Sequence, residues 1–530
     1  MGGRTLSNYR KKLGIQDSLW LLMDRPNNLM VVDSVIWTAE PLDRDRTREV
    51  LTERLWNRYP VFRSLAVKDS DGDWWWEEDP TAKLEDVITY VELDDPDDPR
   101  SLQELVAAHR TEPLGLDRPL WRVLWVDRYL GGSALIVRSH HSVADGMRMV
   151  QLSMSLFGAS PEGGAILAPA VDHYGAHTAM PAPSTGERTL SVMGALGDQA
   201  TGTVGAAVTA VREAVSLAWR VPGAIVGTAG EARGAVTNPF GALHGWINAA
   251  WVVGNETVAE AGEIARSALM GSGPLVEVFS GVPGDIDTIR KLLLGTRNNA
   301  AIWTGSASDD KAVSWSEPLS LAEVKQIARS ERVTVNDVLA TCVAGALHRY
   351  LVDRDQHCAS VTFMVPVNLT PIDLTLPEEL GNSFALVQLE LPTDEPDLVA
   401  VLHVVRRRMD RIKHGHEAAV AFRVQETVAG LSRSVYEASV DLLANRTVGV
   451  LTNVPGPPMP VYLAGCRVEG MTGWAPLSGD QPMSFTIYSY DGRVTVGVAC
   501  DRQLIPDHEA LVVGFVDAFA DLRARVSGAQ

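Results

Sequence analysis

The 530-residue chain contains little cysteine and no long apolar run. No two of its four cysteines are spaced as C-x-x-C, which argues against a disulfide scaffold and against a zinc ribbon. No run of ~18 uninterrupted apolar residues occurs, so we expect no membrane-spanning helix. Residues 1–12 are polar and basic and no apolar segment follows them, so we expect no secretory signal. Together these absences favour a cytoplasmic protein.

Positive charge is also scarce. The chain has 47 Lys and Arg residues against 66 Asp and Glu residues, a formal net charge of -19. Such a protein repels phosphate backbones, which argues against a nucleic-acid partner. Hydrophobic residues make up 46% of the chain and charged residues 21%, which is typical of a globular protein. A chain of this length can bury a large core without a metal or a disulfide.

Several catalytic signatures are missing. No G-x-S-x-G occurs, so a serine hydrolase has no nucleophile motif. No G-x-x-x-x-G-K-[ST] and no G-x-G-x-x-G occur, which argues against the two common nucleotide-binding loops. The zinc-protease motif H-E-x-x-H is absent as well. We therefore expect neither a bound metal nor a cofactor.

The first 160 residues are predicted to form a mixed α/β unit. The predicted elements are a strand over residues 29–38, a helix over residues 43–59, a strand over residues 133–141 and a helix over residues 147–157. Pro60 ends the first helix, and the turn signal Gly131–Gly132 precedes the second strand. Asp145 is placed to cap the N-terminus of the second helix.

The middle of the chain differs in composition. Residues 161–187 are rich in proline, glycine and alanine, which predicts a linker or a loop. Residues 191–221 are rich in alanine, valine and glycine and predict a helix. That helix either packs on the protein or contacts lipid through a weak apolar stripe.

The last part of the chain is predicted to form a second α/β unit. The predicted elements are helices over residues 320–330, 335–351 and 508–525, and strands over residues 360–367, 384–391 and 494–499. We therefore divide the chain into an N-terminal half of residues 1–160, a linking segment of residues 161–311 and a C-terminal half of residues 312–530.

The most informative segment is His140–Gly146, which reads HHSVADG. Side chains alternate between the two faces of a strand, so His140 and His141 cannot both point into one pocket. The same alternation separates Ser142 from His141, which argues against a Ser–His nucleophile pair. The segment thus provides one imidazole at the end of a strand, held by a turn that contains a carboxylate.

This arrangement suits general-base chemistry on an alcohol or an amine. Asp145 is expected to hold the turn by bonding backbone N–H groups or an arginine. Gly146 suits a turn with unusual dihedral angles, or a close approach of substrate. A purely structural His–Asp pair would give the same pattern. A metal site would need three or four converging ligands, which the segment does not supply.

Five further motifs accompany this segment. They are Pro119–Trp121 (PLW), Asn336–Asp337 (ND), Gly381–Asn382 (GN), Asn453–Pro457 (NVPGP) and Ser489–Gly492 (SYDG). HHSVADG resembles the HHxxxDG motif of the acyltransferase and condensation superfamily, which includes chloramphenicol acetyltransferase. The whole set spans nearly the full chain and resembles the bacterial wax ester synthase / acyl-CoA:diacylglycerol acyltransferase family, to which triacylglycerol synthases belong.

The resemblance implies an α/β fold of two chloramphenicol-acetyltransferase-like halves with a central tunnel between them. It implies that His141 is the general base that deprotonates an acceptor hydroxyl. That hydroxyl would attack the acyl-CoA thioester directly, without a covalent acyl-enzyme. His140 would be a supporting residue, Asp145 a structural one and Gly146 the turn residue.

Seven more residues are implied to shape the tunnel and its surroundings. They are Pro119, Leu120, Trp121, Asn336, Asp337, Gly381 and Asn382. One stretch departs from the family pattern, because Leu369–Pro371 stand where an arginine often follows V-P-V-N. Asp145 is therefore expected to pair with another cation, such as Arg138 or an arginine of the C-terminal half.

The resulting hypothesis is an O-acyltransferase that moves a long-chain acyl group from acyl-CoA to diacylglycerol, with a fatty alcohol as a second acceptor. We expect it to bind peripherally to the inner membrane or to lipid droplets, through Arg10–Lys12 or residues 191–221. Two alternatives stay open. One is a condensation-type enzyme with a different acceptor or a carrier-bound donor, and the other is a non-catalytic lipid-binding protein.

Overall fold

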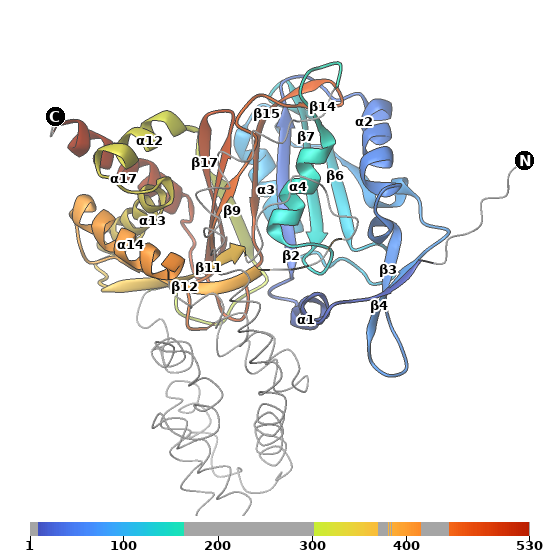
Figure 1. The fold of residues 1–530 in the computed structure, drawn as a ribbon, viewed down its shortest axis with the longest axis horizontal. Helices are drawn as coiled ribbons and strands as arrows, with labels where there is room; N and C mark the ends of the chain where they lie inside the picture. The colour runs from blue at the N-terminus through green and yellow to red at the C-terminus, as the bar shows by residue number, and fades with distance from the viewer. Residues whose placement is uncertain are drawn as a thin grey trace, which may run out of the picture. The chain divides into compact units, whose positions relative to one another are not determined.

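The fold is known from a computed structural model (Figure 1). The structure describes residues 9–163, 302–368, 380, 382, 384–414 and 445–528. All of these residues belong to one compact unit. Most of the predicted linker and all of the predicted helix over residues 191–221 lie outside the described residues.

The N-terminal part of this unit is built on a seven-stranded sheet with the order β5-β6-β7-β2-β15-β14-β8. Its strands are β2 (Val31–Thr38), β5 (Ile88–Val91), β6 (Trp121–Tyr129), β7 (Gly132–His140), β8 (Phe157–Gly158), β14 (Tyr462–Leu463) and β15 (Cys466–Trp474). The hairpin between β6 and β7 turns at Leu130 and Gly131, which have φ angles of 48° and 86°. The left-handed backbone at this point explains the glycine, because a residue without Cβ adopts it at little cost.

Helices cover both faces of this sheet (Figure 1). They are α2 (Arg44–Leu51), α3 (Pro99–His109) and α4 (Gly146–Leu156), whereas α1 (Ile15–Met23) lies at the end of the sheet where β7 ends. α3 buries Leu102 in the core that contains Ile136. α2 and α4 bury Leu51 and Leu152 in the core that contains Leu135, on the opposite face. α2, α3 and α4 each begin after an aspartate that accepts a first-turn backbone N–H, as a good N-cap does.

The C-terminal part is built on a five-stranded sheet, in which β9 and β10 share one edge of β17 and the order continues through β16 to β13. Its strands are β9 (Lys311–Trp315), β10 (Leu319–Ser320), β13 (Leu451–Pro455), β16 (Met483–Tyr490) and β17 (Arg493–Asp501). A hairpin of β11 (Ser360–Asn368) and β12 (Phe384–Pro392) adjoins it through a bridge between Met364 and Val450.

Four helices pack together beside the C-terminal sheet (Figure 1). They are α12 (Leu321–Ser330), α13 (Val335–Val352), α14 (Leu398–His414) and α17 (Glu509–Gly528). α13 is the central helix, and its start is fixed by a capping box between Thr334 and Asp337. Its fully buried Val338 joins Phe485 of the sheet and Phe515 of α17 in one core.

Most of the predicted elements are confirmed to within a few residues. The predicted helix over residues 43–59 is shorter, because α2 ends at Leu51 and gives way to a π-helical turn (Thr52–Trp56) and then a 3-10 turn (Pro60–Arg63). The sequence did not lead us to predict α1, α3 or α14, nor the strands β5, β6, β9, β13, β15 and β16.

Strands from the C-terminal half complete the N-terminal sheet. β15 pairs with β2 over a register that runs from Val468 opposite Thr38 to Trp474 opposite Asp33. The short β14 pairs with both β15 and β8. β2 therefore lies inside the sheet, between β7 and β15, and the two halves share one hydrogen-bonded sheet.

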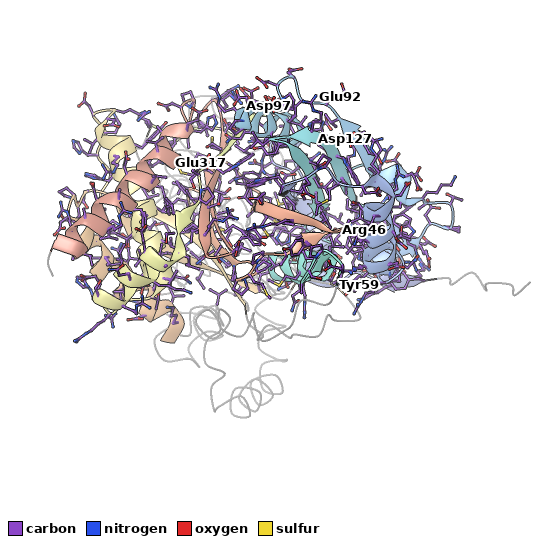
Figure 2. All side chains as sticks on the ribbon, turned by 90° about the horizontal axis from the view of Figure 1, so that it is seen from above. Arg46, Tyr59, Glu92, Asp97, Asp127 and Glu317 are labelled. Atoms are coloured by element: carbon purple, nitrogen blue, oxygen red, sulfur yellow. The ribbon has the colours of Figure 1, made fainter. Side chains whose placement is uncertain are left out.

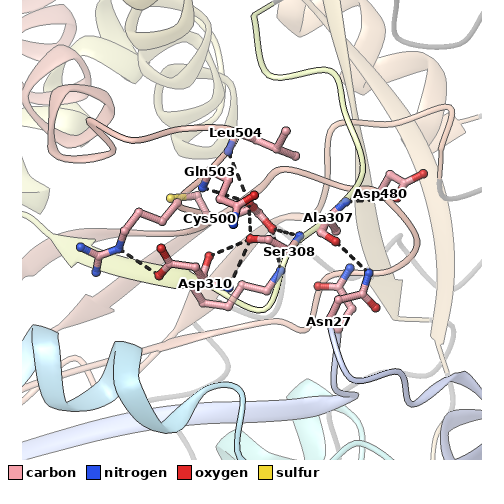
Figure 3. A network of polar contacts seen from close by, with 12 residues as sticks. Asn27, Ala307, Ser308, Asp310, Asp480, Cys500, Gln503 and Leu504 are labelled. Atoms are coloured by element: carbon pink, nitrogen blue, oxygen red, sulfur yellow. Dashed lines mark hydrogen bonds and ion pairs between the residues drawn. The ribbon is translucent and has the colours of Figure 1, made fainter.

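A polar junction joins the halves at a second place (Figure 3). The fully buried carboxylate of Asp501 accepts the backbone N–H of Ser308 at 2.6 Å and its hydroxyl at 2.9 Å. Asn27 Nδ2 donates to the carbonyl of Ala307 at 3.1 Å, and the N–H of Ala307 donates to Asp480 Oδ1 at 3.2 Å. The loop that follows α1 is thereby bound, through Ala307 of the linking segment, to Asp480 of the C-terminal half.

The predicted basic cluster at the start of the chain lies in a three-stranded sheet of β1 (Arg10–Lys12), β4 (Trp74–Glu78) and β3 (Ser64–Lys68). The guanidinium of Arg10 lies over the ring of Trp75, 4.5 Å from its centroid. Lys12 forms an ion pair with Asp73. Two cations of the cluster are thus engaged within the fold itself.

Acidic side chains of the N- and C-terminal halves lie on the surface. Figure 2 labels Glu92, Asp97 and Glu317, all of which are exposed. No helix within the described ranges combines the length and the apolar character needed to cross a membrane.

Candidate active site

A cavity of about 270 Å³ lies inside the compact unit and is lined by both halves of the chain. The N-terminal half contributes residues of α1, β2 and α4 to its wall, and the C-terminal half contributes residues of α13, β11, β12, α14, β13, β15 and β16. Apolar side chains form most of the wall, among them Val32, Met149, Leu339 and Ile487. A mainly apolar cavity with a few polar groups suits an apolar ligand that carries one reactive polar centre.

His141 is placed on this wall by the end of β7. Its backbone N–H donates to the carbonyl of Met30 at 2.8 Å, which extends the pairing between β7 and β2 by one residue. The side chain is 7% exposed. Its ring stacks on Trp20 of α1, with centroids 4.0 Å apart and an interplanar angle of 23°. Phe384 lies 5.6 Å away in a tilted arrangement.

This burial changes the acid–base behaviour of His141. Desolvation lowers the pKa of the imidazole from 6.5 to about 4. Hydrogen bonds to its own backbone carbonyl and to Asn382 act in the opposite direction but do not outweigh the burial. The ring is therefore neutral at physiological pH and keeps a lone pair that can accept a proton.

Asn382, from the C-terminal half, contacts His141 through both ends of its side-chain amide. Its Oδ1 lies 3.0 Å from His141 Nδ1, and its Nδ2 donates to the His141 carbonyl at 2.9 Å. The same Nδ2 donates to Asp17 Oδ1 of α1 at 2.8 Å, and the Asn382 backbone N–H reaches that oxygen at 3.1 Å. Burial raises the pKa of the Asp17 carboxyl.

His140 points elsewhere, as the strand alternation predicts. Its Nδ1 lies 2.7 Å from Ser142 Oγ and accepts the Ser142 backbone N–H at 3.2 Å. Its Nε2 lies 3.2 Å from Asp24 Oδ2, close enough for an ion pair but without hydrogen-bond geometry. Ser142 is therefore bonded to the buried His140 and not to His141, which agrees with the argument against a Ser–His nucleophile pair.

Asp145 and Gly146 form the start of α4 on the cavity wall. Asp145 accepts the backbone N–H of Arg148 at 2.8 Å, so the predicted N-cap is confirmed. The expectation of unusual dihedral angles at Gly146 is wrong, because its φ is not in the left-handed region. A Cβ built on Gly146 would meet no heavy atom within 4 Å. This glycine therefore leaves open space beside His141 and relieves no backbone strain.

The residues of the PLW motif, all of which the structure describes, are not part of the cavity wall. Pro119 is buried, and Leu120 and Trp121 are 1% and 2% exposed in the core beneath the N-terminal sheet. Trp121 Nε1 donates to the carbonyl of Phe62 at 2.8 Å, and the Leu120 carbonyl accepts the N–H of His140 at 2.9 Å. The motif supports the strand end that carries the histidines, so its placement as tunnel wall is corrected.

The four remaining predicted tunnel residues differ in whether they reach the site. Asn336 lines the cavity, and its Oδ1 accepts Asn453 Nδ2 at 2.6 Å. Asp337 is fully buried, and its Oδ2 accepts the backbone N–H of Thr334 at 2.7 Å, so it caps α13 instead of facing the cavity. Gly381 lies outside the described residues, whereas Asn382 reaches the site through His141.

The expectation that Arg138 pairs with Asp145 is wrong. Arg138 Nε donates to Asp33 Oδ1 at 3.0 Å, and Arg110 donates to the other oxygen of Asp33 at 2.6 Å. These three residues form a buried charge cluster on the face of the sheet that α3 covers. The departure at residues 369–371 lies outside the described residues.

Sequence reasoning missed Asp17, Trp20 and Phe384. Asp17 and Trp20 lie on α1, a helix that was not predicted, although the apolar spacing within residues 15–23 is the signal that could have found it. Phe384 opens a predicted strand, but nothing in the sequence singled it out as a site residue. None of the three belongs to a motif that carries chemistry by itself.

Two family models match the chain. The wax ester synthase/diacylglycerol acyltransferase catalytic domain matches residues 13–252, and the WS/DGAT C-terminal domain matches residues 380–523. The first contains HHSVADG and the second contains Asn382, so the two matches include both halves of the site.

Individual proteins agree with these matches. A Mycobacterium tuberculosis protein named "Probable diacyglycerol O-acyltransferase tgs1" is 26% identical over 459 residues, which is 85% of this chain and 81% of that protein. The O-acyltransferase WSD of Acinetobacter baylyi is 24% identical over 204 residues, which is 37% of this chain and 43% of that protein.

Solved structures share the fold. The wax ester synthase/diacylglycerol acyltransferase from Marinobacter aquaeolei VT8 matches with a TM-score of 0.60 at 17% identity, over 98% of this chain and 100% of that one. The first condensation domain of the calcium-dependent antibiotic synthetase matches with a TM-score of 0.51 at 15% identity, over 98% and 97%. The predicted chloramphenicol-acetyltransferase-like α/β fold is thus confirmed. The chain belongs to the wax ester synthase/diacylglycerol acyltransferase family and is an acyltransferase.

Proposed function

We propose that this acyltransferase moves a long-chain acyl group from acyl-CoA to diacylglycerol, with a fatty alcohol as a second acceptor. The observation that carries the proposal is the buried, neutral imidazole of His141 on the wall of an apolar cavity. The names of the relatives, which include diacylglycerol O-acyltransferase and wax ester synthase, support this choice of acceptors.

In the proposed reaction His141 is the general base. The neutral ring takes the proton from the acceptor hydroxyl while the hydroxyl oxygen attacks the thioester carbonyl carbon. A C–O bond forms, the tetrahedral intermediate collapses, and the C–S bond breaks. The proton then passes from the imidazolium to the departing sulfur of coenzyme A. Because the acceptor oxygen attacks directly, no covalent acyl-enzyme is formed.

A base with a pKa of about 4 is unprotonated at physiological pH, but it binds a proton only weakly. The imidazolium forms only as the tetrahedral oxyanion forms beside it, and the attraction between the two charges in a cavity of low dielectric offsets the burial. General-base assistance contributes about 10²–10⁴-fold, or about 3–5 kcal/mol. Most of the remaining acceleration must come from holding thioester and hydroxyl together in the cavity.

The test is an acyl-transfer assay on the purified full-length chain. Labelled palmitoyl-CoA is supplied with diacylglycerol or with hexadecanol, and triacylglycerol and wax ester are separated and counted. His141→Ala should lower kcat by roughly 10²–10⁴-fold without changing the circular dichroism spectrum. The matched control is His348→Ala, because His348 of α13 has its Nδ1 2.9 Å from the carbonyl of Thr393 and does not line the cavity.

Either of two results would overturn the proposal. Full activity in His141→Ala would remove His141 as the base. No product with either acceptor, from folded wild-type protein, would refute the proposed acceptors. Transfer from a carrier-bound thioester but not from free acyl-CoA would then identify a condensation-type enzyme.

We further infer that the protein takes its acceptor from a membrane or droplet surface, because diacylglycerol and fatty alcohols are insoluble in water. Co-sedimentation with phosphatidylcholine vesicles, with and without 10 mol% diacylglycerol, measures this contact. A protein that stays in the supernatant in both cases while it turns over detergent-dispersed diacylglycerol would contradict the inference.

A further inference from the structure

The side-chain amide of Asn382 can be oriented in one way only. Its Nδ2 lies 2.9 Å from the His141 carbonyl and 2.8 Å from Asp17 Oδ1, and both of those atoms accept hydrogen bonds. A flipped amide would place its oxygen against two acceptors and lose both bonds. The atom of Asn382 that faces His141 Nδ1 at 3.0 Å is therefore the oxygen, which cannot donate.

This orientation determines which nitrogen of His141 carries the proton. An amide oxygen bonds only to a protonated ring nitrogen, so Nδ1 is the N–H and Nε2 keeps the lone pair. The second hydrogen-bond partner of the ring, the carbonyl of His141 itself, is also an acceptor and agrees with this assignment. Free imidazole side chains prefer the opposite tautomer, with the proton on Nε2, so the site must enforce this one.

We propose that Asn382 is a positioning residue, held by Asp17, that keeps His141 in the tautomer protonated at Nδ1 and so presents Nε2 as the nitrogen that accepts the proton of the acceptor hydroxyl. This inference rests on the proposed function, because it takes His141 as the general base. Asn382 needs no contact with substrate for this role, because it acts only through His141.

Asp17 supplies the rigidity of this arrangement. A single oxygen of Asp17 accepts both the side-chain and the backbone N–H of Asn382, at 2.8 and 3.1 Å. Asp17 lies in α1, three residues before Trp20, which stacks on the ring of His141. One helix of the N-terminal half thus fixes the ring plane directly and fixes the ring proton through Asn382 of the C-terminal half.

The direct test is the protonation state of the ring in the full-length wild-type protein. Long-range ¹H–¹⁵N correlation spectra of deuterated protein labelled with [¹⁵N]histidine distinguish the two neutral tautomers. The chain has 12 histidines, so the His141 signals are assigned by their loss in His141→Gln. We expect a protonated Nδ1 and an unprotonated Nε2 at pH 7. A protonated Nε2 would overturn the proposal, whatever the activity of the protein.

Kinetics test the consequence for catalysis. Asn382→Ala should shift the ring toward the Nε2–H tautomer and lower kcat roughly 10–100-fold, the usual cost of losing an orienting partner, with little change in either KM. Asp17→Ala should give a smaller loss of the same kind. The matched control is Asn445→Ala, because Asn445 also bonds an aspartate through its side-chain amide but lies away from the cavity wall. Its Nδ2 donates to Asp480 Oδ2 at 3.3 Å, and its Oδ1 accepts the Asp480 backbone N–H at 2.8 Å.

An exchange variant separates positioning from general structural support. In the double variant Asp17→Asn with Asn382→Asp, the carboxylate still accepts the Nδ1 proton, but it can no longer donate to the His141 carbonyl. The new amide at position 17 can bond either the carboxylate or the backbone N–H of position 382, where one Asp17 oxygen bonded both N–H groups. We therefore expect the Nδ1–H tautomer to return and only part of the lost kcat to be recovered. The acidic limb of the kcat/KM profile should also move to higher pH, because a carboxylate stabilises the imidazolium.

The outcomes for this proposal and for the proposed function are distinguishable. Wild-type tautomer and kcat in Asn382→Ala would refute the positioning role and leave His141 as the base. Loss of kcat with an unchanged tautomer would refute it as well, since the effect would be structural. Full activity of His141→Gln would refute the proposed function, even if the spectra showed the expected Nδ1–H ring.

Discussion

Trp20 controls how far His141 is shielded from water. The indole stacks on the imidazole at a centroid distance of 4.0 Å and lines the same cavity. Burial lowers the pKa of His141 from 6.5 to about 4. Trp20→Ala exposes one face of the ring to water that enters the cavity, while Phe384 still covers another side. The pKa of His141 should therefore rise part of the way back toward 6.5.

The size of the effect follows from the two pKa values. Complete exposure of the ring to water would raise the pKa of His141 from about 4 back to 6.5, which corresponds to about 3 kcal/mol. Opening one of the two ring faces should recover roughly half of it, about one unit or about 1.4 kcal/mol. The acidic limb of kcat/KM, which reports the free enzyme, should thus move from about pH 4 to roughly pH 5.

The free energy of unfolding should also depend on pH through the titration of His141. The folded ring stays neutral where the unfolded one is protonated, so the unfolded state binds more protons between pH 4 and 6.5. His141 therefore favours the folded state fully above pH 6.5, and this contribution is lost as the pH falls toward 4. The loss should be smaller in Trp20→Ala, because its folded pKa is closer to the unfolded value.

The assay is kcat/KM for palmitoyl-CoA with saturating diacylglycerol between pH 3.5 and 8. Activity regained on return to pH 7 separates titration from acid unfolding. Trp75→Ala is the matched control, because Trp75 is a half-buried indole on β4 that bonds Asp69 at 2.7 Å and does not line the cavity. A wild-type limb near pH 6.5, or an unchanged limb in Trp20→Ala, would refute the reasoning.

Three further predictions concern the neighbours of His141. Trp121→Ala should lower the free energy of unfolding by about 3–5 kcal/mol in urea titrations, with no selective change in KM, because the indole is core. Gly146→Val should raise KM for diacylglycerol more than for hexadecanol and change the free energy of unfolding by under ~1 kcal/mol, because its Cβ points into open space. Asp145→Ala should lower the free energy of unfolding by at least ~1 kcal/mol through the lost N-cap, and Asp145→Asn should restore that part. An unfolding midpoint equal to that of the wild type in Asp145→Ala would contradict the last expectation.

Local sequence pattern predicted what is local in this structure. The strands β2, β7 and β12 and the helices α4, α12 and α13 follow from side-chain periodicity and caps, because each depends on neighbouring residues. The opposite directions of His140 and His141 follow from the alternation of a strand in the same way. These elements place the histidine pair correctly at the end of β7.

The partners of His141 could not be predicted in this way. Asn382 lies 241 positions from His141 and 365 positions from Asp17, and no periodicity relates residues so far apart. The family motif pointed to Asp145 as the residue that holds the loop, and Asp145 does cap α4. The hydrogen bond to the imidazole ring nonetheless comes from an asparagine that the motif set had placed in the tunnel wall.

The entry of β15 into the N-terminal sheet sets the order in which this protein can be built during synthesis. β2 is complete at Thr38, but its partner strand begins at Cys466, more than 400 residues later. At about 5–20 residues per second, the ribosome leaves one edge of β2 unpaired for on the order of 20–80 s. An open strand edge is a site of wrong pairing, so the nascent chain needs protection there. The contact between Asn382 and His141 likewise cannot form until Asn382 has been synthesised. The active site is therefore assembled late, and no product truncated before Asn382 can carry it.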